Sequence, residues 1–213
     1  NKEIHKRWML FAIFVVVQEA AKLAAQLPPK SDFMVFCPRH KDVFRVNSAI
    51  LQMTRTAAGI RNSTIFDFKK GETMLVVEAG KQAAALKIRN GSIVTVFQDT
   101  STSGQSTDDI QVTYTAPDGS KNVGWLTLGE VDWPWCHTGH SSQGVECDTG
   151  IVVLTKSQVT TRRWLYTAVS RCRHKCYLVC VPETLDECLD PDNNPERRTL
   201  LPVFLDKAKQ HFH

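Results

Sequence analysis

Residues 150–181 read GIVVLTKSQVTTRRWLYTAVSRCRHKCYLVCV. The stretch opens with a β-branched apolar run at residues 150–154 and closes with a second apolar run at 176–181, which Pro182 ends. Between these two predicted buried strands, residues 162–170 form a predicted helix. Strands that alternate with helices predict a largely parallel sheet with helices on both faces. Such sheets bind ligands at the carboxyl ends of their strands.

The N-terminal part of the chain follows the same alternation. Residues 3–27 predict a helix with alanine-rich spacing, which a pair of prolines stops. Residues 33–37 predict a short buried strand bounded by Pro38. A polar turn follows, and a helical pattern of apolar residues then runs through Val43, Val46, Ile50 and Leu51.

The middle of the chain has a different pattern. Short β-branched runs predict strands at residues 74–77, 93–97, 110–114 and 123–128. The dipeptide Asn90-Gly91 between the first two runs is a turn signal. Several short strands in so few residues predict a small all-β insert within the α/β fold.

Composition narrows the class of protein. The chain has 213 residues, of which 42% are hydrophobic and 23% charged, so a disordered or collagen-like chain is excluded. A net charge of +4 permits a nucleic-acid or phosphate partner without requiring one. The apolar run at residues 9–17 is too short to span a membrane. Seven scattered cysteines favour a reducing, intracellular compartment over a disulfide framework.

Two polar segments carry candidate chemistry, TGHSSQGVE at residues 138–146 and LYTAVSRCR at residues 165–173. The first offers hydroxyls, an imidazole and an amide, which suit phosphate oxygens and sugar hydroxyls. The second places Arg171 at the end of a predicted helix, where its guanidinium can match phosphate oxygens. Ordinary alternatives stay open, since Ser/Thr/Gly loops are common and an arginine at a helix end is usually a dipole partner or a surface charge.

These segments resemble motifs V and VI of superfamily 1 DNA helicases of the RecD-like branch, within the second RecA-like domain (the UvrD-like helicase C-terminal domain). Motif V of that family runs T-x-H-x-S-Q-G-x-E, and motif VI resembles Y-T-A-x-[ST]-R-x-[RK]. The matching positions are Thr138, His140, Ser142, Gln143, Gly144 and Glu146 in the first and Tyr166, Thr167, Ala168, Ser170, Arg171 and Arg173 in the second.

Weaker matches extend the resemblance upstream, so that it covers residues 33–182. Residues 38–43, with Asn47, resemble motif IV. Residues 71–77 and the turn after them resemble the strand and turn that lead into an inserted SH3-like barrel. The resemblance therefore implies a RecA-like parallel sheet with helices on both faces, interrupted by a small SH3-like all-β insert.

The same resemblance implies a division of the chain into three parts. Residues 1–72 would form the first part of the second RecA-like domain, and residues 73–133 the SH3-like barrel. Residues 134–213 would complete the RecA-like domain with motifs V and VI and a C-terminal tail.

The resemblance also implies a role for each matched residue. Arg171 would be the arginine finger that reaches the γ-phosphate of ATP. The nucleotide-binding residues would be Gln143, Gly144, Glu146, Arg39 and Arg173. The single-strand contacts would be Thr138, His140 and Ser142. ATP and Mg²⁺ are the implied cofactors, and no metal ligand is expected in this chain.

A P-loop is missing from the chain, because a P-loop requires G-x-x-x-x-G-K-[ST]. Gly80-Lys81 is followed by Gln82 and fails this pattern. The P-loop and the magnesium ligands would lie on an N-terminal domain of the same protein, so this chain should not hydrolyse ATP alone. The family resemblance implies 5′ to 3′ unwinding and favours single-stranded DNA over RNA. The absence of an initiator methionine at Asn1 favours a fragment of a longer helicase.

Two other classes of function stay open from the sequence. A helicase remnant could bind nucleic acid without catalysis, or the β insert could serve protein interaction. A zinc site is one interpretation of Cys172, His174, Cys176 and Cys180. Buried free thiols are the favoured interpretation, because Cys176 and Cys180 lie in a predicted buried strand. Trp133, Trp135 and Trp164 could stack on bases, although core packing is favoured.

Overall fold

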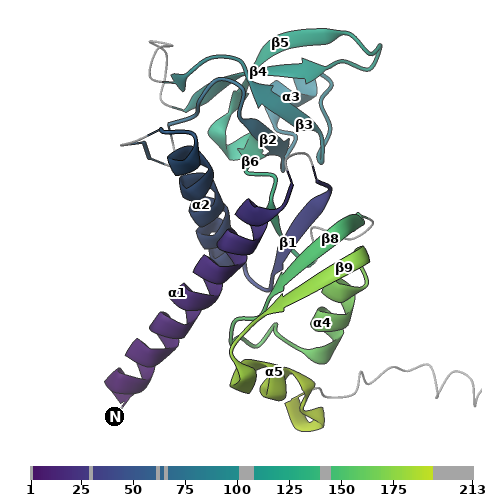
Figure 1. Cartoon of the computed structure of the whole chain (residues 1–213). Coiled ribbons are helices and arrows are strands. Elements are labelled where there is room, and N and C mark those ends of the chain that lie inside the picture. The colour runs from purple at the N-terminus through teal and green to yellow at the C-terminus, as the bar shows by residue number, and fades with distance from the viewer. Residues whose placement is uncertain are drawn as a thin grey trace, which may run out of the picture.

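The computed structural model describes residues 2–28, 31–60, 63–64, 67–100, 108–139 and 145–193, and side chains from residue 11 onward. The helices are α1 (Lys2–Gln26), α2 (His40–Ala57), α3 (Lys81–Ala85), α4 (Arg162–Val169) and α5 (Pro182–Leu189), with short 3-10 turns η2 (Leu128–Glu130) and η3 (Pro191–Asn193). Figure 1 shows two sheets, one above the other, with the long helices α1 and α2 to their left. No helix in the described part of the chain is long and apolar enough to cross a membrane.

A four-stranded parallel sheet forms the lower half of the molecule (Figure 1). Its order is β7-β1-β8-β9, with bounds β7 Cys136–Thr138, β1 Phe33–Cys37, β8 Cys147–Val153 and β9 Cys172–Val179. The central strand β1 pairs in parallel with both β7 and β8. The expected α/β class with a parallel sheet is confirmed.

Side-chain alternation along β1 explains why both faces of this sheet carry helices. Val35 and Cys37 are fully buried and join the core beneath α1 and α2. Phe36, between them in sequence, points to the opposite face and packs in the core that includes Trp164 of α4. Because successive strand residues point to opposite faces, an apolar run with no alternation is buried on both sides.

The strand β9 differs from its prediction as a buried strand at residues 176–181. It starts earlier, at Cys172, and ends at Val179, and Cys176 is exposed. The physical reason is its position, since β9 pairs only with β8 among the described strands and forms an edge of the sheet. An edge strand tolerates charged side chains because water reaches it directly.

A second sheet, five-stranded and antiparallel, lies at the top of Figure 1. Its order is β5-β4-β3-β2-β6, with bounds β2 Thr73–Val76, β3 Ile93–Val96, β4 Asp109–Thr115, β5 Lys121–Thr127 and β6 Val131–Asp132. Alternate residues such as Met74, Val94 and Ile110 are buried in a core of their own. The Asn90-Gly91 turn precedes β3, with Gly91 at a φ of +82° that glycine adopts readily.

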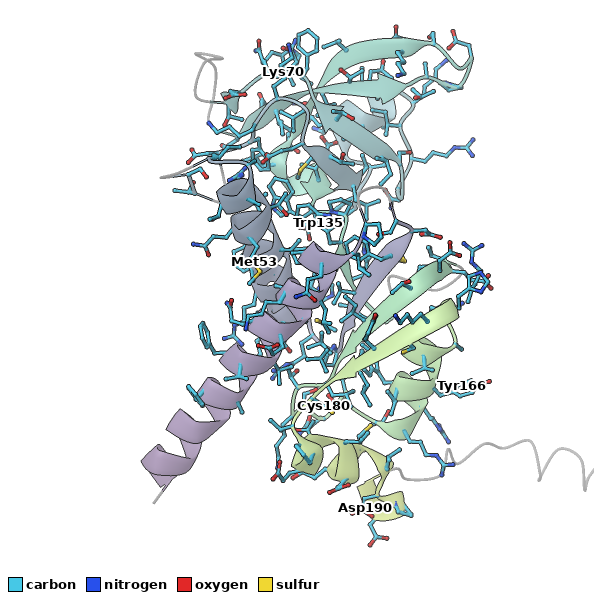
Figure 2. All side chains as sticks on the ribbon, in the orientation of Figure 1. Met53, Lys70, Trp135, Tyr166, Cys180 and Asp190 are labelled. Carbon is cyan, nitrogen blue, oxygen red and sulfur yellow. The ribbon has the colours of Figure 1, made fainter. Side chains whose placement is uncertain are left out.

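The two sheets meet at the C-terminal half of α2. Arg55, only 4% exposed, forms a two-pronged ion pair with Glu72, with N–O distances of 2.7 and 2.9 Å. Trp133 stacks on both Phe68 and Trp135, with ring centroids 5.4 and 5.5 Å apart. Figure 2 shows Trp135 between α2 and β1, at the base of the antiparallel sheet. Core packing, not an exposed stacking platform, is therefore the environment of Trp133.

Candidate functional site

The candidate residues divide between the two ends of the parallel sheet. Thr138 is the last residue of β7 and lies at the carboxyl end of the strands. Glu146 and Arg171 directly precede β8 and β9, so both lie at the amino end. Because β7 and β8 flank β1 in parallel, the described ends of this segment, Thr138 and Glu146, lie at opposite ends of the sheet. The segment that resembles motif V thus connects two separate sites.

The main chain of Arg171 is held by a hydrogen bond, while the Nε of its side chain has no hydrogen-bond partner among the described residues. Its carbonyl oxygen accepts a hydrogen bond of 2.9 Å from the amide of Cys147, the residue after Glu146. Its Nε is buried and has no hydrogen-bond partner in the described part of the chain. A buried donor without a partner is uncommon in folded proteins. An anionic oxygen is the group that would satisfy it best.

Arg173, two residues further on, is already paired. Its Nη2 lies 2.7 Å from a carboxylate oxygen of Asp32 and 2.9 Å from one of Asp148. The Nε2 atom of His174 lies 3.6 Å from the same carboxylate oxygen of Asp148. Asp32 and Asp148 carry no motif signal in the sequence, and the pairing of β1 with β8 is what brings them together. A nucleotide contact by Arg173 would require it to exchange these partners.

The thiols beside Arg171 are protonated at neutral pH. Burial raises the pKa of Cys147 to about 11 and that of Cys172 to about 12. A neutral thiol is a poor nucleophile and a poor metal ligand. Among the residues that the structure describes, no group of three or more His, Cys, Asp or Glu side chains is placed to hold a metal ion.

Arg39 lies at the opposite end of the sheet from Arg171, just after β1. Its Nε donates to Asp42 at 2.7 Å, and its Nη2 reaches the hydroxyl of Thr155 at 3.3 Å. That hydroxyl in turn donates to Asp42 at 2.7 Å, and the Asp42 side chain is fully buried. The predicted nucleotide contact is therefore part of a local ion-pair network, on the end of the sheet where β1 and β8 finish.

Thr138 and the residue before it are mostly enclosed. Thr138 is 6% exposed and His137 is 9% exposed. Burial lowers the pKa of His137, whose ring hydrogen-bonds the Pro134 carbonyl at 2.9 Å. Four further predicted site residues, His140, Ser142, Gln143 and Gly144, lie outside the described residues. The structure thus groups Glu146, Arg171 and Arg173 at one end and Arg39 and Thr138 at the other.

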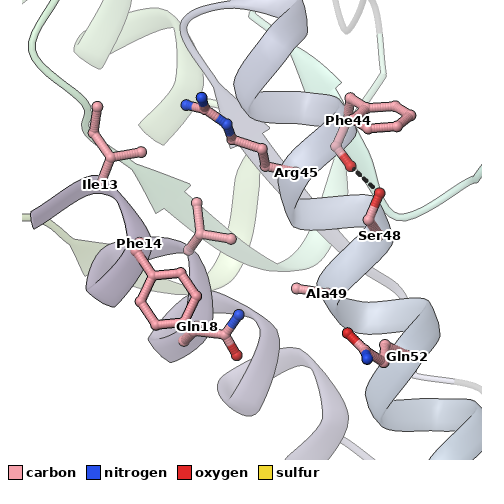
Figure 3. A pocket seen from close by; sticks show the side chains of 9 residues that line it. Ile13, Phe14, Gln18, Phe44, Arg45, Ser48, Ala49 and Gln52 are labelled. Carbon is pink, nitrogen blue, oxygen red and sulfur yellow. Dashed lines mark hydrogen bonds between the residues drawn. The ribbon is translucent and has the colours of Figure 1, made fainter. Parts of the chain in front are cut away.

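Surface hollows lie elsewhere on the domain. One of about 380 Å³ lies between α1 and α2, and Phe14 of α1 and Phe44 of α2 are among the residues that line it (Figure 3). Another, of about 310 Å³, lies beside Gly139 at the start of α4. Neither includes Arg171. Tyr166 of the segment resembling motif VI is 75% exposed on the outer side of α4 (Figure 2).

Comparison with known families gives one match within this chain. Residues 135–179 match the family described as the UvrD-like helicase C-terminal domain. The matched span begins just before β7 and ends with β9, so it contains both polar segments and the strands that hold them. A comparison with curated protein sequences finds no match.

Solved structures of Pif1 helicases resemble the chain at low identity. The Pif1 helicase from Bacteroides in complex with ADP-AlF3 and ssDNA has 12% identity and a TM-score of 0.49, covering 91% of this chain and 50% of that chain. The Pif1 helicase from Candida albicans has 12% identity and a TM-score of 0.47, covering 93% and 58%. This chain spans about half the length of those helicase chains.

Proposed function

We propose that this chain is the second motor domain of an ATP-dependent superfamily 1 helicase of the RecD-like branch, which moves 5′ to 3′ along single-stranded DNA. Arg171 is its arginine finger, and an N-terminal P-loop domain of the same protein completes the nucleotide site. Residues 1–72 and 134–213 form the RecA-like domain, and residues 73–133 form the SH3-like insert. The match of residues 135–179 to a helicase C-terminal family supports this proposal.

The unpaired Nε of Arg171 is the observation that carries the proposal. The main-chain bond to Cys147 fixes the backbone from which the Arg171 side chain extends. An arginine supplied from a neighbouring domain stabilises the charge that develops as a γ-phosphoryl group is transferred. Bound ATP would supply that phosphoryl group, and Arg171 would hold its oxygens through a planar fork of donors.

Neighbouring residues fit the edge of such a site. Glu146 is exposed, and the next residue, Cys147, is the hydrogen-bond partner of the Arg171 carbonyl. The Glu146 carboxylate can therefore meet a ribose hydroxyl or an ordered water. Gln143 and Gly144 precede it in the same segment and would complete the nucleotide contacts. The acidic ligands of Mg²⁺ would belong to the P-loop domain. Arg39 and Arg173 have carboxylate partners here, so neither is needed for the proposal.

The layout also suggests how strand and nucleotide could be coupled. Residues 139–146 join Thr138 at the carboxyl end of the sheet to Glu146 at the amino end. The main chain therefore joins the proposed strand contacts to the proposed nucleotide contacts beside Arg171. In this proposal His140 and Ser142 contact the strand, and Gln143 through Glu146 contact the nucleotide.

The coding sequence upstream of Asn1 tests the proposal directly. We expect a strand followed by G-x-x-x-x-G-K-[ST] and a helix, within the same reading frame. An upstream region that holds no P-loop would contradict the motor assignment for this polypeptide. The chain would then be a nucleic-acid-binding remnant, and single-strand binding without ATPase activity would be its measurable property.

A further inference from the structure

A hollow of about 310 Å³ lies at the carboxyl end of the parallel sheet, between the start of α4 and Gly139. It is on the opposite end of the sheet from Arg171, because α4 leads from the end of β8 back to the start of β9. Its walls are Gly139, Gln158, Val159, Thr161, Arg163, Trp164 and Thr167. Gly139 directly follows Thr138, so the hollow adjoins the strand-contact residues predicted from the sequence.

The polar groups around this hollow favour an anion. Arg163 contributes a full positive charge on an exposed side chain, and no Asp or Glu is among the described residues that line the space. The hollow lies at the N-terminus of α4, where Thr161 caps the helix by accepting a hydrogen bond from the Trp164 amide at 3.3 Å. Amide groups of a first helical turn point outward and attract negative charge.

The indole of Trp164 provides an independent sign of a missing acceptor. Trp164 is 5% exposed, and its Nε1 is buried with no hydrogen-bond partner in the described part of the chain. The indole lies close under Gly139, where an added Cβ would come within 2.7 Å of Nε1. Buried indole N–H groups usually find a partner. Both Trp164 and Gly139 line the hollow, so this unpaired donor belongs to a side chain of its wall.

Thr138 is too enclosed to be the main contact with the single strand. It was predicted as a strand contact, but it is 6% exposed, so little of it can reach a strand. The hollow next to it offers accessible donors on Arg163 and Gln158.

We propose that the hollow between α4 and Gly139 binds a backbone phosphate of the single strand, through Arg163, the first turn of α4 and the indole N–H of Trp164. The proposal rests on the proposed helicase function, since it takes the strand to be the source of the phosphate. Phosphate contacts of this kind hold the register of a strand and do not read its sequence. The site is separate from the nucleotide site at Arg171.

The test uses the full chain labelled with ¹⁵N at its five tryptophans, whose indole N–H resonances are followed by NMR. Trp164→Phe identifies the resonance of Trp164. The chain is titrated with an oligothymidylate of about eight nucleotides and, separately, with inorganic phosphate. We expect the Trp164 indole resonance to shift on saturation with the oligothymidylate and to stay in place with inorganic phosphate at the same concentration.

Two arginine variants sharpen the test. Arg163→Ala should weaken oligothymidylate binding by about fivefold and reduce the slope of log affinity against log salt by about 1. Arg162→Ala removes the same charge from the adjacent position, which does not line the hollow, and should change affinity by less than about twofold.

Several results would overturn the proposal. If the oligothymidylate binds but the Trp164 resonance does not move, or if both arginine variants weaken binding equally, the strand lies elsewhere and the helicase function stands. A shift with inorganic phosphate alone identifies a free-anion site instead. If the oligothymidylate does not bind at all, both the phosphate site and strand binding by this chain fail.

Discussion

Arg173 joins three strands of the parallel sheet at the end where Arg171 lies. Its guanidinium contacts Asp32 before β1 and Asp148 in β8, and all three side chains are close to half exposed. Exposed ion pairs stabilise a protein by at most about 1 kcal/mol each. The network therefore contributes more to aligning the starts of the strands than to global stability.

Asn47 of α2 holds the start of β7 through buried hydrogen bonds. It is 1% exposed, accepts a hydrogen bond from the Cys136 amide at 2.9 Å, and donates to the carbonyls of Trp133 and Cys136. Asn47→Ala leaves these buried groups unpaired and should lower the free energy of unfolding by about 3 kcal/mol. Urea denaturation of both proteins measures the difference.

Gln52→Ala is the matched control for this prediction, since Gln52 lies on the exposed side of the same helix. It should change the free energy of unfolding by less than about 0.5 kcal/mol. Equal effects of the two substitutions would show that Asn47 does not hold the start of β7.

Residue type alone could identify Arg171 as a candidate, but it could not separate Arg171 from Arg173. Both match the same helicase motif in the sequence. The difference lies in Asp32 and Asp148, which are far from β9 along the chain and meet it only in the folded sheet. The same holds for Arg39, whose partner Thr155 is 116 positions away.

Among the elements, η2 and α3 are held together by a single buried carboxylate. Glu130 is 4% exposed and accepts hydrogen bonds from the amides of Ala83 and Thr127, at 3.0 and 2.9 Å. Burial on its own would raise the pKa of Glu130. These hydrogen bonds and that of the Thr127 hydroxyl outweigh it, so the pKa lies below its usual value of 4.5.

The antiparallel sheet should therefore lose stability in acid through Glu130. Its folded pKa is below its unfolded value, so its stabilisation is complete above the unfolded pKa and is lost as pH falls through the folded pKa. Glu130→Gln should cost about 1–2 kcal/mol near neutral pH and should flatten this acid dependence. Urea midpoints at neutral pH and below the unfolded pKa measure both effects; an identical acid slope in the variant would contradict the assignment.

The sequence predicted the bounds of an element where prolines lie on both sides of an apolar run. The strand β1 has the predicted bounds, because prolines precede and follow an apolar run. The helix α3 was not predicted, because its five residues are too few to show a helical pattern of apolar side chains. For β9 the apolar run was visible, but its place at the sheet edge depends on pairing with β8 alone, which the run does not encode.

In the whole molecule, Arg55 links α2 of the parallel half to the antiparallel half. Besides its pair with Glu72, it donates to the carbonyls of Thr64 and Asp67 and lies over the ring of Trp133 at 5.7 Å. Removing one partner of a buried ion pair leaves the other charge without compensation. This single side chain therefore matters to the junction between the two sheets.

Arg55→Ala should lower the free energy of unfolding by about 3–5 kcal/mol. Arg45→Ala is its control, since Arg45 is 41% exposed and its contact with Asp42 is long, at 3.4 Å, so about 0–1 kcal/mol is expected. Chemical denaturation followed by tryptophan fluorescence measures the difference, and Trp133, one of the five tryptophans, lies beside Arg55. A loss below about 1 kcal/mol for Arg55→Ala would show that the two sheets are joined by other contacts.

At this scale the sequence predicted the order of the parts but not their contacts. Alternating helices and strands with a β-rich middle were readable from local patterns, and the parallel sheet followed from that order. The stacking of Trp133 on Phe68 and Trp135 joins segments that no local pattern relates. The opposite placement of Thr138 and Arg171 likewise needed the strand order β7-β1-β8-β9.

The central claim is that Arg171 acts on a nucleotide bound by a P-loop domain of the same protein. Single-strand-stimulated ATPase activity of the complete protein tests it, with Arg171→Ala compared with Arg162→Ala. We predict that Arg171→Ala lowers kcat by about 10³-fold and leaves single-strand affinity within about twofold, while Arg162→Ala keeps its activity. An Arg171→Ala enzyme with unchanged kcat would contradict the assignment of the arginine finger.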